Sequence, residues 1–182
     1  QGAAAHRKIQ KAMTGDYRKE VSLSLETEAG GFPLLLQGRA DGVFTAEDGL
    51  LTIDEIKSTT LPLEKLAVQQ AQHLGQAQCY VYMLLQTLDA PPETVGVQLT
   101  YYQLETEELQ RRRFVFSREE IAALTPAYGG ISHARLDGPA AERGLQWPCP
   151  DEDHPGTAVL HVSSFSGGLG AFSTPDYILS LI

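Results

Sequence analysis

Hydrophobic residues recur along the first two thirds of the chain with the two periods that separate helices from strands. Residues 3–13 predict a short helix that stops at residues 14–16, where a glycine and an aspartate follow one another. After Pro62, residues 63–88 repeat leucine, alanine and valine at helical spacing and predict the longest helix of the chain. Two consecutive prolines, Pro91 and Pro92, end that helix.

Alternation of apolar and polar residues predicts the strands. In residues 19–27 the apolar positions fall on every second residue, so they share one face. Further strands are predicted at 33–45 and 50–58, which a short glycine-containing turn joins into a hairpin, and at 94–104 and 111–116. The order is helix, three strands, helix, strand (αβββαβ), with one more strand after it. Helices and strands interleaved in this way predict an α/β fold with helices flanking a central sheet.

Composition narrows the class of protein. The chain has 182 residues, 42% of them hydrophobic, which is enough for one ordinary globular domain. No stretch approaches the roughly 20 apolar residues of a membrane span, so we expect no membrane partner. Cys79 and Cys149 are the two cysteines, too few for a disulfide scaffold or a four-thiolate metal site. The chain begins at Gln1 without a signal peptide, so we expect an internal piece of a longer, cytoplasmic protein.

Two polar clusters interrupt the predicted hairpin where a core strand should be apolar. They are residues 38–41 (GRAD) and residues 54–57 (DEIK). Alternation places Glu55 and Lys57 on one face of their strand and Asp54 on the other, so Asp54 is left out of the predicted site. If the strands are neighbours, Asp41 lies across from Glu55, and the two carboxylates can share a divalent cation. The alternative is a salt-bridge cluster on the surface of an edge hairpin.

A polar stripe on the long helix indicates a second part of the same site. Gln69, His73, Gln76 and Tyr80 are spaced by four, three and four residues, so they line one side of the helix beside its apolar stripe. A helix with one apolar and one polar side engaged faces a site. The alternative is a solvated glutamine-rich face.

Residues 2–116 resemble the PD-(D/E)XK nuclease superfamily in its RecB-like branch, and within it the nuclease module of DinG-like helicases. The resemblance depends on five elements in the family's order. These are G-x-x-x-H (Gly2 to His6), a glutamate opening the first strand (Glu20), G-x-x-D (Gly38 to Asp41), E-x-K (Glu55 to Lys57) and Q-x-x-x-Y (Gln76 to Tyr80). No P-loop motif occurs in the sequence, so this piece is not expected to contain an ATP-hydrolysing motor.

The resemblance implies a restriction-endonuclease-like core with a mixed sheet, and a role for each site residue. His6, Asp41 and Glu55, with the backbone carbonyl of Ile56, would hold Mg²⁺ or Mn²⁺. Lys57 would orient the attacking water or stabilise charge on the phosphate, while Gln76 and Tyr80 would brace the site and contact the DNA. The site that the resemblance implies therefore comprises His6, Asp41, Glu55, Lys57, Gln76 and Tyr80.

The activity that the resemblance implies is metal-dependent hydrolysis of phosphodiester bonds in single-stranded or unwound DNA. A helicase motor in the full-length protein would deliver that strand. Three alternatives stay open: the module is an inactive nuclease-like domain that binds DNA or supports a neighbour, His6 is a solvated residue of a frayed helix, and Glu20 is an exposed strand residue rather than a group supporting the site.

Net charge bears on how DNA is held. The chain carries −9 at neutral pH, which argues against a surface that coats nucleic acid non-specifically. Phosphate contacts need only local basic groups. Candidates are Arg7, Lys8, Lys11, Arg39 and the run Arg111–Arg113, although that run also suits a solvated strand edge.

Residues 117–182 differ in character, and we expect them to form a second, loosely ordered part of the chain. Lysine does not occur after Lys65, and glycine, proline and serine become frequent. Residues of about 119–178 resemble a segment of the molybdopterin-dependent formate dehydrogenase large subunit, without that family's cofactor ligands. Either a gene fusion or a chimeric sequence accounts for the junction, and a fragment of such an oxidoreductase is a third functional alternative. Cys149, between two prolines, is expected to be structural.

Overall fold

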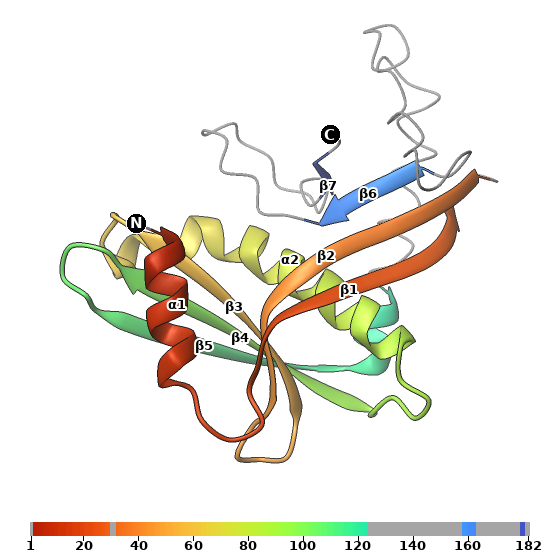
Figure 1. Cartoon of the computed structure of the whole chain (residues 1–182), viewed down its shortest axis with the longest axis horizontal. Coiled ribbons are helices and arrows are strands. Elements are labelled where there is room, and N and C mark those ends of the chain that lie inside the picture. The colour runs from red at the N-terminus through yellow and green to blue at the C-terminus, as the bar shows by residue number, and fades with distance from the viewer. Residues whose placement is uncertain (1, 30–31, 124–157, 163–178, 181–182) are drawn as a thin grey trace, which may run out of the picture.

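The computed structural model describes residues 2–29, 32–123, 158–162 and 179–180. In chain order these residues form the following elements: α1 (Gly2–Ala12), β1 (Arg18–Ala29), β2 (Phe32–Thr45), β3 (Leu51–Thr59), the 3₁₀ helix η1 (Leu63–Leu66), α2 (Ala67–Gln86), β4 (Thr94–Gln103), β5 (Leu109–Ser117), β6 (Ala158–Val162) and β7 (Leu179–Ser180). The predicted fold class, an α/β fold with a mixed sheet flanked by helices, is confirmed (Figure 1). The predicted long helix is divided, because its first four residues take the tighter 3₁₀ form.

The sheet has the order β5-β4-β3-β2-β6-β7, with β1 on the other edge of β2. β3 and β4 are parallel, as are β2 and β6, whereas β1–β2, β2–β3, β4–β5 and β6–β7 are antiparallel. The parallel β3–β4 pair requires a crossover connection, and α2 supplies it.

Strand β2 changes partner along one edge, and this creates a fork in the sheet. β2 pairs with β3 only over residues 42–45, and with β6 only over residues 34–38. Residues 39–41 pair with neither strand, so β3 and β2 diverge beyond that point, as Figure 1 shows. The second polar cluster, residues 54–57, begins where the β2–β3 pairing stops.

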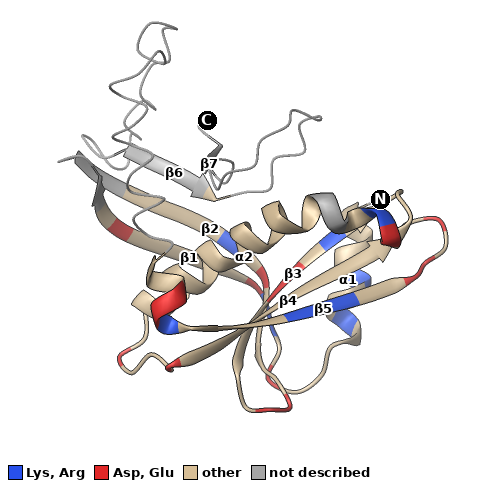
Figure 2. Ribbon diagram, turned by 180° about the vertical axis from the view of Figure 1, so that it is seen from behind, with Lys and Arg blue, Asp and Glu red and all other residues tan. Residues whose placement is uncertain are grey.

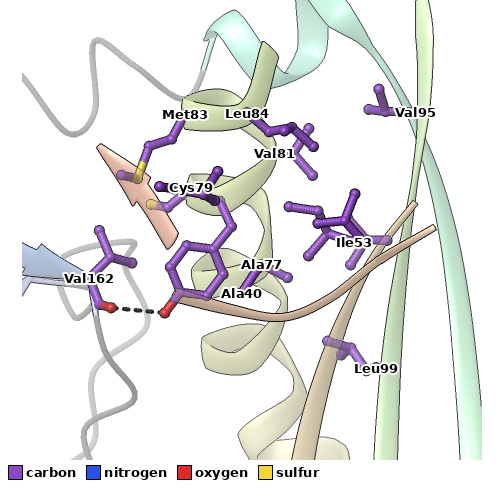
Figure 3. Packing of buried hydrophobic residues seen from close by; sticks show 14 of the residues in the cluster. Ala40, Ile53, Ala77, Cys79, Val81, Met83, Leu84, Val95, Leu99 and Val162 are labelled. Atoms are coloured by element: carbon purple, nitrogen blue, oxygen red, sulfur yellow. Dashed lines mark hydrogen bonds between the residues drawn. The ribbon is translucent and has the colours of Figure 1, made fainter. Parts of the chain in front are cut away.

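The two helices pack against the sheet with separate apolar clusters. The larger cluster joins α2 to the sheet and includes Ala77, Val81 and Leu84 of the helix with Ile53 and Leu99 of the strands (Figure 3). The smaller cluster joins α1 to β3 and β4 through Ala5, Ile9, Ile56 and Tyr102. The side chains of β3 alternate between the two faces of the sheet, so Ile53 lies in the larger cluster and Ile56 in the smaller one.

The described residues beyond position 116 take part in this fold. Ile121 is fully buried in the larger cluster, and Val162 at the end of β6 belongs to it as well. The division of the chain at residue 116 and the loose ordering expected beyond it stay predictions. Cys149, His133 and His154 lie outside the described residues. In the part of the chain that the structure covers, no helix is long and apolar enough to cross a membrane.

Candidate active site

A pocket of about 250 Å³ opens at the fork between β2 and β3. Its walls come from both strands, both helices and the end of β6, and its lining residues are His6, Arg39, Asp41, Glu55, Lys57, Gln76, Tyr80 and Val162. The structure thus brings the six predicted site residues around one pocket, although they come from four elements spread over 75 positions of the sequence, from 6 to 80.

Asp41 is held in place by α1 and by β3. Its Oδ1 atom lies 3.2 Å from Nδ1 of His6, and its Oδ2 atom accepts a hydrogen bond of 2.8 Å from the backbone N–H of Ile56. The Asp41 hydrogen bond is the largest of the influences that raise the pKa of His6 above its usual value, and burial acts in the opposite direction. The aspartate therefore faces the strand that carries Glu55, one residue before Ile56.

Glu55 is a buried carboxylate that is only half satisfied. Its side chain is 3% exposed, and Oε1 lies 2.7 Å from Nζ of Lys57. Its Oε2 atom has no hydrogen-bond partner in the described structure. Burial raises the pKa of Glu55 to about 7, with Asp41 adding to the rise and Lys57 opposing it.

The unpartnered oxygen suits a cation. Two carboxylates and an imidazole line the pocket, and oxygen ligands with a nearby imidazole are a donor set that Mg²⁺ or Mn²⁺ accepts. Glu55 Oε2 is a buried acceptor with nothing to accept from, which is the position that a bound cation would satisfy. In the described residues as they stand, no three His, Cys, Asp or Glu side chains are gathered closely enough to hold a metal ion. Binding would therefore require the side chains of His6, Asp41 and Glu55 to move closer together.

A chain of hydrogen bonds connects the catalytic candidate Lys57 to the end of β6. Nζ of Lys57 donates to Oε1 of Gln76 (2.9 Å), Nε2 of Gln76 donates to the hydroxyl of Tyr80 (3.0 Å), and that hydroxyl donates to the carbonyl of Val162 (2.8 Å, dashed in Figure 3). Because the tyrosine hydroxyl has a single hydrogen, donating it to Val162 leaves it to accept from Gln76, which turns Oε1 toward the lysine.

Gly38 allows Tyr80 to reach this position. A Cβ atom on residue 38 would lie 2.5 Å from a ring carbon of Tyr80. The glycine of the G-x-x-D motif thus leaves room for the tyrosine of the Q-x-x-x-Y motif.

Two lining residues, Arg39 and Val162, were not among the predicted site residues. Arg39 appears in the sequence only as one of several candidate phosphate contacts. Val162 lies 82 positions from Tyr80, and the only sequence signal that could have found it is the short apolar run of residues 158–162.

Other polar residues that the sequence drew attention to lie away from the pocket. Asp54 is fully buried elsewhere, where it accepts hydrogen bonds from Tyr17 (3.0 Å) and Thr100 (2.6 Å). The arginines of residues 111–113 lie on the edge strand β5, where Figure 2 shows a band of basic residues. Neither group lines the pocket.

His73 of the helical stripe packs against the sheet, where its Nδ1 and the Tyr101 hydroxyl are 3.0 Å apart. Burial lowers the pKa of His73 from 6.5 to about 4. The unfolded chain therefore takes up a proton at this residue before the folded protein does as the pH falls. The stabilising effect of a neutral His73 is complete above pH 6.5 and disappears as the pH falls to about 4.

We expect this histidine to account for a loss of at most about 3 kcal/mol of unfolding free energy between pH 6.5 and 4. Urea unfolding of the wild type and of His73→Gln across this range measures it, because the variant lacks the titrating group while other ionisable groups are common to both proteins. Parallel pH dependence in the two proteins would contradict the expectation.

Comparisons with known proteins bear on this site. The family model described as the PD-(D/E)XK nuclease superfamily matches residues 2–150. Curated relatives match over short stretches. The F420-dependent formate dehydrogenase 2 subunit alpha of Methanococcus maripaludis is 39% identical over 61 residues, which is 32% of this chain and 8% of that protein. The assimilatory nitrate reductase catalytic subunit of Bacillus subtilis is 51% identical over 39 residues, 21% of this chain and 5% of that protein.

The chain therefore spans only a small part, 8% and 5%, of these two relatives. Among solved structures, one described as the crystal structure of SSO0001 is similar with a TM-score of 0.48 and 18% sequence identity. The likeness covers 68% of this chain and 55% of that one.

Proposed function

Because the chain belongs to the PD-(D/E)XK nuclease superfamily, we propose that it is a metal-dependent deoxyribonuclease whose active site is the pocket at the fork. The observation that carries the proposal is that Asp41 and a buried, half-satisfied Glu55 line the same pocket beside Lys57. The finer assignments, to the RecB-like branch and to the nuclease modules of DinG-like helicases, rest on the motif resemblance.

Asp41, Glu55 and His6 would hold Mg²⁺ or Mn²⁺, with the carbonyl of Ile56. When bound, such a cation makes water a stronger nucleophile near neutral pH and offsets the negative charge that develops on the phosphate. The side chains of Asp41, Glu55 and His6 already line the pocket, and Glu55 Oε2 is free to accept.

Lys57 would act on the reacting groups themselves. Its side chain is 16% exposed, and its ammonium group has three hydrogens, of which Glu55 and Gln76 engage two. The remaining hydrogen can orient the attacking water or donate to a phosphate oxygen, where a donor fixed in advance stabilises the transition state most. Gln76 and Tyr80 would hold the lysine ammonium group in position through the hydrogen-bond chain to Val162.

The substrate would be single-stranded or unwound DNA, delivered by a helicase motor elsewhere in the full-length protein. This part of the proposal rests on the resemblance of the motifs to helicase-associated nucleases. A basic band on β5 and basic residues on α1 provide local positive charge on a protein of net charge −9.

The test is cleavage of labelled single-stranded and duplex DNA by the purified chain, with Mg²⁺, Mn²⁺ or EDTA. We expect cutting only with a divalent cation, faster on the single strand, and loss of cutting in Asp41→Ala. Asp48→Ala is the matched control, since that exposed aspartate pairs with Arg113 away from the pocket. Cutting retained in EDTA, or undiminished in Asp41→Ala, would reject the proposal.

A second candidate is an inactive nuclease-like module that binds DNA without cutting it. The observation that favours it is the direct Glu55–Lys57 contact of 2.7 Å, in which a lysine already occupies one oxygen of the carboxylate that a metal would need. Titration calorimetry with Mn²⁺ distinguishes the two: an active site should bind the cation and lose that binding in Glu55→Gln, whereas an inactive module should show no Glu55-dependent heat.

A further inference from the structure

The ladder between β1 and β2 skips one position beside the pocket. Lys19 pairs with Gly42 and Val21 pairs with Ala40, but Glu20 and Asp41 between them are not paired. The backbone of Glu20 has φ of +53°, a left-handed conformation that is disfavoured for residues with a Cβ atom. Such a conformation persists only where the surroundings enforce it.

The interruption changes which residues face the core. Val43 and Ala40, which flank Asp41 in the sequence, both pack into the larger apolar cluster. They are three positions apart, whereas residues on one face of a regular strand are two or four positions apart. Regular alternation in β2 therefore slips by one residue at this point. The slip leaves Asp41 and Arg39 directed toward the pocket while Ala40 stays in the core.

A buried glutamine of α1 compensates for the missing ladder bond. Gln10 is 7% exposed, and its Nε2 atom donates to the backbone carbonyl of Asp41 and to Oε1 of Glu20, both at 2.9 Å. One amide group thus binds both residues at which the ladder is broken.

The other oxygen of Glu20 holds Arg39. Oε2 lies 2.9 Å from Nε of Arg39, whose side chain is 68% exposed and lines the pocket. Within the described residues the two terminal nitrogens of this guanidinium make no further hydrogen bond, so their hydrogens remain available. A guanidinium fixed through Nε presents the geometry that binds two oxygens of a phosphate.

We propose that Arg39 binds a phosphate of the DNA strand at the pocket, and that Glu20 and Gln10 are its positioning residues. This inference rests on the proposed function. Among the residues that the structure describes, the pocket is lined by one other lysine or arginine, Lys57, and that residue is already engaged by Glu55 and Gln76. Arg39 is therefore the group that can take up a phosphate without breaking a contact of the catalytic candidates. The strained backbone of Glu20 costs conformational free energy, and the role of its side chain in positioning Arg39 gives a reason for that cost.

The test measures binding rather than cutting. Fluorescence anisotropy with a labelled single-stranded oligonucleotide in EDTA gives the dissociation constant of the full chain from low to moderate salt. We expect Arg39→Gln to weaken binding about ten-fold at low salt and to reduce the slope of log K against log salt by about 0.7, the contribution of one phosphate contact on a single strand. Arg39→Lys should retain the slope with part of the affinity, since it keeps the charge but not the planar fork.

Arg118→Gln is the matched control, because Arg118 also pairs with a glutamate, Glu93 at 2.7 Å, and does not line the pocket. It should leave the slope unchanged. The positioning role is tested by Glu20→Ala, which should weaken binding in the wild type but add nothing in an Arg39→Gln background. Independent effects of the two substitutions would overturn the positioning role.

A slope and affinity unchanged in Arg39→Gln would overturn the assignment of Arg39, as would a wild type that shows no salt-dependent binding. Because no cation is present, this result is separate from the cleavage test. A protein that binds through Arg39 and never cuts would overturn the proposed function alone.

Discussion

Replacement of Lys57 by alanine is expected to reduce the rate of DNA cleavage by about 10²–10⁴-fold, with little change in the affinity for DNA. The lysine touches Glu55 and Gln76 and is the donor directed at the pocket from β3. Its effect should fall on the chemical step, since a donor that acts on the reacting oxygen is worth most in the transition state. Single-turnover cleavage at saturating enzyme, compared with anisotropy titration in EDTA, separates the two quantities.

Lys19→Ala is the control for loss of a positive charge on a strand, because Lys19 does not line the pocket. Circular dichroism and urea unfolding of both variants establish that the fold is retained. A cleavage rate of Lys57→Ala within ten-fold of the wild type would contradict the role given to this residue.

The second large effect is expected from Glu55→Gln, which should stabilise the cation-free protein while abolishing cleavage. The folded pKa of Glu55 is about 7, above its ordinary value of 4.5. Stability associated with the protonated carboxyl is therefore complete below pH 4.5 and is lost as the pH rises to 7. Glutamine has nearly the same shape as the protonated acid but cannot ionise, so it avoids this loss.

At pH 8 the variant should be more stable than the wild type by up to about 3 kcal/mol, and the difference should vanish near pH 4.5. Addition of Mn²⁺ at about a hundred times its dissociation constant should stabilise the wild type by about 2.7 kcal/mol and the variant hardly at all. Thermal unfolding at the two pH values, with and without Mn²⁺, measures these changes. A variant less stable than the wild type at pH 8 would show that Glu55 stabilises the fold instead.

The sequence predicted the elements well because their periodicity is local. The strand that carries Glu55 and Lys57, and the hairpin that brings Asp41 toward it, follow from alternation and a turn signal alone. The structure also agrees with the predicted facing of Asp54, because alternation in β3 directs this side chain to Tyr17 and Thr100.

What the sequence could not show depends on contacts between distant segments. The slip in β2 lies opposite the left-handed backbone of Glu20, 21 positions from Asp41, and no alternation pattern in β2 itself reveals it. The carbonyl of Val162 completes the hydrogen-bond chain from β6, and a backbone acceptor has no sequence signature. The start of the long helix was misplaced because Leu63–Leu66 has helical composition but forms a 3₁₀ turn.

The modest anchoring of α1 has a consequence for motion. This helix contributes His6 and Gln10, yet the apolar cluster that attaches it to the sheet consists of Ala5, Ile9, Ile56 and Tyr102. Segments with few buried apolar contacts open locally at a lower free energy than the whole domain. We therefore expect α1 to detach while the strands remain folded, so that its backbone amides exchange with deuterated solvent ahead of those of β3 and β4. A ligand that engages His6 would slow that exchange, so occupancy of the pocket and closure of the amino-terminal helix would be one coupled equilibrium.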